Sequence, residues 1–148
     1  MKRVIFLCTG NSARSQMAEA FLRKYGDSEF ETYSAGLEPK PLNPFTVQVM
    51  QEVGIDVSGQ KSKGIKMFLG TMLFSHLVTV CDDAEKNCPT VWPGVRYRLH
   101  WSFDDPAALE GSDEQKLAKF REVRELIEKQ IKVFLVEQKD SQGLIKEE

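Results

Sequence analysis

A short apolar run, a polar loop and a helix-like segment follow one another near the start of the chain and constrain its fold more than any other feature. The run is VIFL at residues 4–7, and the loop is CTGNSARS at residues 8–15. A buried strand that passes through a tight loop into a helix points backbone N–H groups and the positive end of the helix dipole at one place. We therefore expect this loop to bind a tetrahedral oxyanion.

The first residue of this loop, Cys8, is a candidate nucleophile. A helix N-terminus and a nearby arginine lower the pKa of a cysteine from about 8.5 into the range of roughly 3.5–7.5. We therefore expect Cys8 to be a thiolate at neutral pH. Arg14 carries a planar fork of donors that matches two oxygens of a bound anion at once. The alternative is a buried structural cysteine that precedes an arginine by coincidence.

The composition is that of an ordinary globular protein. The chain has 148 residues, of which 41% are hydrophobic and 28% charged, with a net charge of −2. We expect a single domain over residues 1–148, cytoplasmic and monomeric, with no signal peptide and no affinity for nucleic acid or membranes. Three cysteines are an odd number, which argues against a static disulfide framework.

Strand-like and helix-like segments alternate along the chain. The expected strands are residues 3–7, 30–36, 76–80 and 95–101, the last at a sheet edge. The expected helices are residues 14–25, residues 44–53 with Asn43 as N-cap, a short one within 67–74, and a long one opened by Ser112 and Gln115 as a capping box. Residues 81–89 are expected to form a loop, and residues 137–148 a frayed polar tail.

This alternation predicts an α/β fold with helices on both faces of a four-stranded parallel sheet. In the order 2-1-3-4, the first and third strands are neighbours, and ligands bind beyond their carboxyl ends. Cys8 ends the first strand and Cys81 ends the third. The two thiols are therefore expected to lie side by side.

The spacing Cys-x5-Arg-Ser after a strand resembles the signature of the low-molecular-weight protein tyrosine phosphatase superfamily. Within it, the stretch CTGNSARSQMAE at residues 8–19 is most similar to the thioredoxin-coupled arsenate reductases. The resemblance implies a three-layer sandwich fold. The stretch VTVCDDAEKNCP at residues 78–89 resembles the reductase loop that carries the second and third redox cysteines, here Cys81 and Cys88, with Pro89 behind them.

Asp105 is the candidate general acid. Transfer of an oxyanion to a thiolate requires a proton for the departing oxygen, and a partly desolvated carboxylic acid can supply it. The stretch HWSFDDP at residues 100–106 resembles the reductases throughout, and Asp105 matches the acid of the superfamily's Asp-Pro motif. The phosphatases tend to follow this motif with tyrosines, whereas Ala107 and Ala108 follow it here.

The resemblance implies a reaction and a role for each residue. Cys8 attacks arsenate, Arg14 and the loop stabilise the oxyanion, and Ser15 donates a hydrogen bond to the thiolate. Cys81 then attacks Cys8 and releases arsenite, and Cys88 resolves the Cys8–Cys81 disulfide into a Cys81–Cys88 disulfide. A thioredoxin-type dithiol regenerates the protein, with no tightly bound cofactor, and phosphate or sulfate mimics arsenate. The residues expected to bind substrate are Thr9, Gly10, Asn11, Ser12, Ala13 and Arg14.

Some relatives bind a monovalent cation beside the anion loop. Asn11, Glu19 and Ser34 match residues that are used there. Lys63 stands where a further carboxylate would complete the site. We therefore expect at most a weak cation site, with the charge of the lysine in place of the ion.

Two alternatives remain at this stage. In a phosphatase, water rather than Cys81 resolves the Cys8 adduct, so loss of Cys81 would spare hydrolysis. In a non-catalytic oxyanion-binding or thiol-sensing module, Asp105 would have no purpose.

Overall fold

The computed structural model describes residues 2–88 and 92–147. It contains the expected four-stranded parallel sheet in the order β2-β1-β3-β4. Its strands are β1 (Lys2–Cys8), β2 (Phe30–Gly36), β3 (His76–Thr79) and β4 (Tyr97–His100). β3 is buried throughout and β1 over most of its length, because each has a neighbour on both sides, whereas the edge strand β4 is largely exposed.

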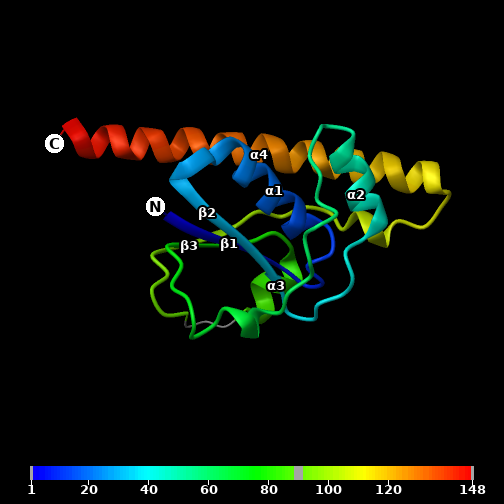
Figure 1. Cartoon of the computed structure of the whole chain (residues 1–148), viewed down its shortest axis with the longest axis horizontal. Helices are drawn as coiled ribbons and strands as arrows, with labels where there is room; N and C mark the ends of the chain where they lie inside the picture. The colour runs from blue at the N-terminus through cyan, green and yellow to red at the C-terminus, as the bar shows by residue number, and fades with distance from the viewer. Residues whose placement is uncertain (1, 89–91, 148) are drawn as a thin grey trace.

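Helices lie on both sides of this sheet. In Figure 1, α4 runs along the top of the molecule beside α1 and α2, while α3 lies below the strands and packs against β1 and β3. The α-helices are α1 (Arg14–Gly26), α2 (Pro44–Gln51), α3 (Asp82–Asn87) and α4 (Asp113–Glu147). Short 3₁₀ turns are η1 (Asp27–Glu29), η2 (Ile65–Met67) and η3 (Pro106–Ala108).

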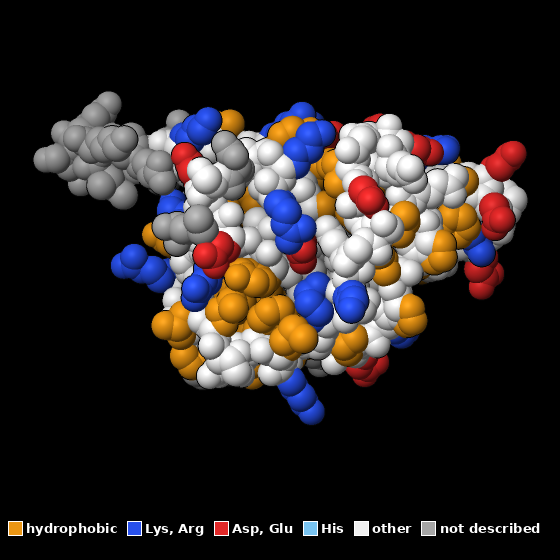
Figure 2. Space-filling model, viewed as in Figure 1, with side chains coloured by type: hydrophobic (Ala, Val, Ile, Leu, Met, Phe, Trp, Pro, Cys, Tyr) orange, Lys and Arg blue, Asp and Glu red, His pale blue; other side chains and the backbone are white. Residues whose placement is uncertain are grey.

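Aromatic side chains cover the two faces of the sheet. On the α4 face, Trp101 contacts Phe6 and Phe134 with ring centroids 5.8 and 5.7 Å apart. On the other face, Tyr33 meets Phe74 edge to face at 5.4 Å. Figure 2 shows a cluster of apolar side chains at the lower left of the view and further ones at the right, among charged side chains of both signs. The hydrophobic core thus packs against both faces of the sheet. The carboxyl ends of the strands lie outside this packing, where a binding site can form.

Local sequence patterns account for the helix ends. The side chain of Asn43 accepts a hydrogen bond from the N–H of Phe45, and Pro44 opens α2, as predicted. Ser112 and Gln115 form the expected capping box, each side chain bonding the other's backbone N–H. Of the described residues, no helix is both long enough and apolar enough to cross a lipid bilayer.

Three sequence expectations were wrong. Residues 67–74 form no helix beyond the η2 turn, because Gly70 adopts a φ of +82°, outside the right-handed helical range. The expected loop after Cys81 contains α3. The chain from Glu137 does not fray at once, since α4 continues to Glu147.

Candidate active site

The loop between β1 and α1 is fixed by backbone hydrogen bonds to the segment between β2 and α2. The N–H groups of residues 37, 38, 40 and 43 donate to the carbonyls of residues 8, 9, 10 and 12, over N···O distances of 2.8–3.2 Å. The C=O and N–H of a trans peptide unit point in opposite directions. The N–H groups of residues 9, 10, 11 and 13 therefore point away from that segment. This arrangement suits a bound oxyanion.

Buried residues support the loop from behind. Asn11 adopts a φ of 51°, and its amide nitrogen donates to Ser15 Oγ at 2.8 Å while its oxygen accepts from the N–H of Lys63 at 2.8 Å. A Cβ on Gly36 would lie 2.7 Å from the carbonyl oxygen of Thr9, so only glycine fits beside the loop. The expected bond from Ser15 to the sulfur of Cys8 is not among the contacts of the described residues, in which the Ser15 hydroxyl oxygen accepts from Asn11.

A cavity of about 550 Å³ opens at the carboxyl ends of β1 and β3. Loop residues 8–10 and 12–14 form one wall, and Cys81 with the two aspartates after it forms another. Five of the six residues expected to bind substrate face this cavity: Thr9, Gly10, Ser12, Ala13 and Arg14. The sixth, Asn11, is fully buried and acts by holding the loop.

Arg14 and Asp105 meet on the wall of this cavity. Arg14 Nη1 donates to the carbonyl of Phe103 at 3.0 Å, and its Nη2 lies 3.8 Å from Asp105 Oδ2. The other oxygen of Asp105 accepts from the N–H of Ala107, which fixes the carboxylate at the start of η3. The neighbouring Asp104 also borders the cavity, but its side chain is 80% exposed and paired with Lys119. Asp105 is thus the better placed proton donor of the two.

Cys8 and Cys81 meet at the base of the cavity. Both side chains are buried, carry free thiols and line the same cavity. Cys81 also caps α3, because its sulfur accepts from the N–H of Ala84 at 3.4 Å. The hydroxyl oxygen of Thr9 lies 3.6 Å from the same sulfur. The two strands therefore bring together thiols that are more than seventy residues apart in sequence.

The pKa values of this pair differ from the sequence expectation. The pKa of Cys8 is raised, because its thiol donates to Cys81 and is buried; Arg14 and the N–H of Thr9 lower it by less. The pKa of Cys81 falls to about 5, chiefly because of its contact with the Cys8 thiol, with smaller contributions from the N–H of Ala84 and from Arg14, while burial opposes the shift. The contacts of the pair therefore favour a thiolate on Cys81 over one on Cys8, whereas the sequence predicted a thiolate at Cys8.

Cys88 lies at the opposite end of α3 from Cys81 and does not line the cavity. Burial raises the pKa of its thiol, while Arg98 lowers it by less. At 1.5 Å per residue, α3 separates the two Cα atoms by about 10 Å, whereas a disulfide needs about 4.4–6.8 Å. The two cysteines therefore meet only if α3 unwinds. Pro89 lies outside the described residues.

Side-chain hydrogen bonds fasten α3 to the sheet. His100 Nε2 lies 2.9 Å from Asp82 Oδ1, and His100 Nδ1 lies 2.8 Å from the hydroxyl of Thr79. That hydroxyl donates to Glu85 at 2.6 Å, and Ser102 donates to Asp82 at 3.1 Å. Three polar residues of the strands and the following loop thus hold a helix of six residues.

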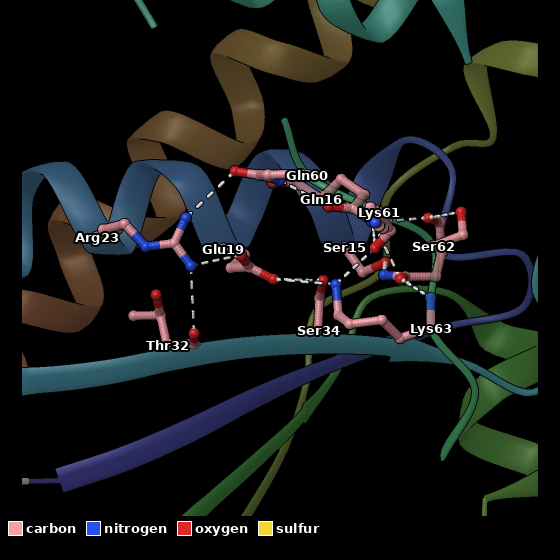
Figure 3. A network of polar contacts seen from close by, with 11 residues as sticks. Ser15, Gln16, Glu19, Arg23, Thr32, Ser34, Gln60, Lys61, Ser62 and Lys63 are labelled. Atoms are coloured by element: carbon pink, nitrogen blue, oxygen red, sulfur yellow. Dashed lines mark hydrogen bonds and ion pairs between the residues drawn. The ribbon is translucent and has the colours of Figure 1, made fainter. Parts of the chain in front are cut away.

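The residues matched to a cation site form a closed polar network (Figure 3). Glu19 is buried, and its carboxylate accepts from Ser34 Oγ at 2.6 Å. Lys63 Nζ lies 3.7 Å from the same carboxylate oxygen, and Arg23 pairs with the other. Burial lowers the pKa of Lys63, and Glu19 opposes this shift. Among the described residues, no group of three or more His, Cys, Asp and Glu is arranged to hold a metal ion.

Sequence reasoning missed several residues on the cavity wall, including Ser102 and Phe103 after β4. Lys40 lines it from the segment after β2, and Asp82 and Asp83 line it from the first turn of α3. The acidic pair directly after Cys81 was the available indication, because acidic residues favour the first turn of a helix. No pattern in the sequence indicated Lys40.

Comparison with known proteins agrees with this geometry. Residues 3–146 match the low molecular weight phosphotyrosine protein phosphatase family. The chain belongs to this family. An arsenate reductase of Halalkalibacterium halodurans is 49% identical over 133 residues, which cover 90% of this chain and 94% of that protein.

Solved structures of family members superpose on the chain. A structure of an arsenate reductase in its oxidised state matches with a TM-score of 0.79 and 31% identity, and covers 93% of this chain and 98% of its own. A thioredoxin-dependent arsenate reductase of Corynebacterium glutamicum matches with a TM-score of 0.69 and 29% identity, over 95% of this chain and 63% of that one.

Proposed function

We propose that this chain reduces arsenate to arsenite and passes the resulting disulfide to a thioredoxin-type dithiol. The observation that carries this proposal is that Cys8 and Cys81 line one cavity together with Arg14 and Asp105. A hydrolase needs a single thiol there, whereas reduction needs a second thiol within reach of the first. Relatives named arsenate reductase support the same conclusion.

In the first step, Cys8 attacks arsenic. The shared proton moves from Cys8 to Cys81, so that Cys8 becomes the thiolate. A bond forms between its sulfur and arsenic, and one arsenic–oxygen bond breaks. The departing oxygen takes a proton from Asp105 and leaves as water. Arg14 and the loop N–H groups stabilise the charge on the remaining oxygens.

In the second step, Cys81 reduces the adduct. Cys81 gives the proton that it took from Cys8 to an oxygen of the arsenic group, and its thiolate then attacks the sulfur of Cys8 and forms a Cys8–Cys81 disulfide. The electron pair of the sulfur–arsenic bond goes to arsenic, which leaves as arsenite. Arsenic gains two electrons, and the two thiols supply them.

In the third step, Cys88 attacks the sulfur of Cys81. A Cys81–Cys88 disulfide forms, and Cys8 is released as a thiolate. This step requires α3 to unwind, because the helix keeps the two cysteines too far apart to bond. Opening of this segment brings the new disulfide toward the surface, where an external dithiol reduces it. One structural relative is named as thioredoxin-dependent, which supports thioredoxin as this dithiol.

The test is a coupled assay with arsenate, thioredoxin, thioredoxin reductase and NADPH. Oxidation of NADPH should depend on arsenate, and mass spectrometry of protein quenched without thioredoxin should find the Cys81–Cys88 disulfide. Cys81→Ser should abolish NADPH oxidation. Arsenate-dependent turnover by Cys81→Ser would contradict the proposal.

Hydrolysis of small phosphate esters is a second candidate activity, because Cys8, Arg14 and Asp105 also suffice for that reaction. Cys81→Ser should retain hydrolysis of an aryl phosphate while losing arsenate reduction. If wild-type protein hydrolyses the ester at rates typical of enzymes and does not reduce arsenate, the chain is a phosphatase. Tight phosphate binding with neither reaction would instead indicate a binding module.

A further inference from the structure

The hydroxyl of Thr9 has one proton and two neighbouring acceptors. Its oxygen lies 2.7 Å from Asp83 Oδ2 and 3.6 Å from Cys81 Sγ. A hydroxyl donates one hydrogen bond. The shorter contact has the length of a charge-assisted bond to a carboxylate, so the proton points to Asp83. In this arrangement Thr9 does not donate to Cys81.

Asp83 is itself held in this position. Its other carboxylate oxygen accepts from Asn87 Nδ2 at 3.0 Å, and the same amide also donates to the backbone carbonyl of Asp83 at 2.9 Å. Asn87 ends α3 and directly precedes Cys88. A chain of hydrogen bonds thus runs from the anion loop, through Asp83, to the far end of α3.

We propose that Asp83 is a positioning residue that keeps the Thr9 hydroxyl turned away from Cys81 until an oxyanion enters the cavity. The proposal rests on the reductase function proposed above. Asp83 lines the same cavity wall as Cys81 and is exposed. An oxyanion on Cys8 brings negative charge close to this carboxylate and repels it. An exposed carboxylate turns into water at low cost, because water replaces its hydrogen bonds.

Release of Asp83 has two consequences for the reaction. The Thr9 hydroxyl becomes free to donate to the sulfur of Cys81, which stabilises the thiolate at the step where it attacks Cys8. The bond between Asp83 and Asn87 is lost as the carboxylate moves, which loosens the end of α3 next to Cys88. A single movement therefore prepares both the second and the third cysteine.

The chain offers a matched control in Asp82. It lies in the same first turn of α3 and carries the same charge, but its carboxylate accepts from Ser102 and lies against His100 rather than Thr9. Asp82→Asn and Asp83→Asn therefore remove equal charge near Cys81, but only the second weakens the acceptor that holds the Thr9 hydroxyl.

The experiment measures the pH midpoint of Cys81 alkylation by iodoacetamide, with peptides separated by mass spectrometry. A midpoint reports the thiolate fraction and is insensitive to changes in access. Asp83→Asn should lower the midpoint by about 0.5–1 unit more than Asp82→Asn does, because the thiolate gains a hydrogen bond. Asp83→Ala, which leaves no acceptor for Thr9, should shift the midpoint in the same direction. Thermal melting of each variant confirms that it is folded.

Two further measurements complete the test. In a Thr9→Val background, Asp83→Asn should shift the midpoint no more than Asp82→Asn. Saturating inorganic phosphate should reduce the difference in pH midpoint between wild type and Asp83→Asn to less than half of its value without phosphate. In the wild type, the bound anion has then already displaced Asp83. Equal shifts for Asp82→Asn and Asp83→Asn, a shift that persists without the Thr9 hydroxyl, or a difference unaffected by phosphate would overturn the inference. Labelling needs no arsenate, so its failure leaves the reductase proposal to the turnover assay.

Discussion

The two sides of the cavity are held in different ways. The loop that carries Cys8 is fixed by backbone hydrogen bonds, by the buried side chain of Asn11 and by close contact with Gly36. The segment that begins at Cys81 is a helix of six residues, mostly exposed, and its links to the rest of the molecule are largely side-chain bonds.

This difference fits the proposed reaction. An oxyanion receptor must keep its geometry, since small displacements of positioned groups cost much of the rate. The second thiol must instead leave the cavity after it reacts. Low local stability in the segment that begins at Cys81 allows this segment to move. The rigid loop that carries Cys8 keeps its geometry during the movement. The following predictions test this division.

The largest effect should come from Cys88→Ser, which removes the far end of the moving segment. Multiple turnover with thioredoxin should fall to background, a loss on the order of 1000-fold or more, as when a reacting nucleophile is removed. One equivalent of arsenite per protein should still form, because Cys8 and Cys81 are intact. Quench-flow measurement of arsenite checks this, and undiminished steady-state turnover would exclude Cys88 from the relay.

Gly36→Ala should disturb the rigid side. The new Cβ would lie 2.7 Å from the carbonyl oxygen of Thr9 and 2.9 Å from the nitrogen of Asn11, so the loop must shift. We expect a loss of about 1–3 kcal/mol of stability from this overpacking and a loss of activity on the order of 100-fold.

Thermal melting and initial rates measure these effects. Gly59→Ala is the control, because a Cβ there meets nothing within 4 Å and the residue has no positive φ. It should leave both quantities nearly unchanged. Equal effects of the two substitutions would mean that contact with the loop is not what requires glycine at residue 36.

His100→Gln should loosen the moving side without affecting the loop. It weakens the contacts to Asp82 and Thr79 that fasten α3. The open form of α3 should become about 5- to 10-fold more populated, since about 1–1.4 kcal/mol of hydrogen bonding is lost. Hydrogen exchange of the α3 amides measures the opening, and the amides of residues 9–13 serve as the internal control. Equal deprotection of both regions would contradict the proposed division.

Acid should produce the smallest effect. Hydrogen bonds from His100 and Ser102 hold the pKa of Asp82 below its ordinary value. A carboxyl with a lowered pKa in the folded state stabilises the fold above its ordinary pKa, near 3.9, and this contribution is lost as the pH falls through the lowered value. Exchange protection of α3 should therefore weaken below about pH 4. If the α3 amides of Asp82→Asn are as well protected from exchange at neutral pH as those of the wild type, this carboxylate does not fasten the helix.

Much of the fold was predictable because its elements depend on local patterns. Three of these patterns involve only residues close together in the sequence: the apolar run before Cys8, the cap at Asn43 and the capping box at Ser112. Strand order follows from the alternation of strands and helices, which allows few arrangements. The prediction that Cys81 lies beside Cys8 depended only on this strand order.

The errors arose where tertiary contacts outweigh local patterns. The apolar stretch near Gly70 resembles a helix, but its aromatic side chains are used to cover the sheet face around Tyr33. The helix after Cys81 is too short for a periodic pattern. The proton distribution between Cys8 and Cys81 depends on a contact between distant residues, so no local rule for cysteine pKa predicts it.

Lys63 has a practical consequence for how this protein is handled. Its ammonium group lies beside the buried carboxylate of Glu19 and is covalently part of the chain. A charge of this kind is always present, whatever salts the buffer contains. Exchange of potassium for sodium or choline at constant ionic strength should therefore leave the melting temperature unchanged, and Lys63→Gln should create a dependence on the cation that the native protein lacks.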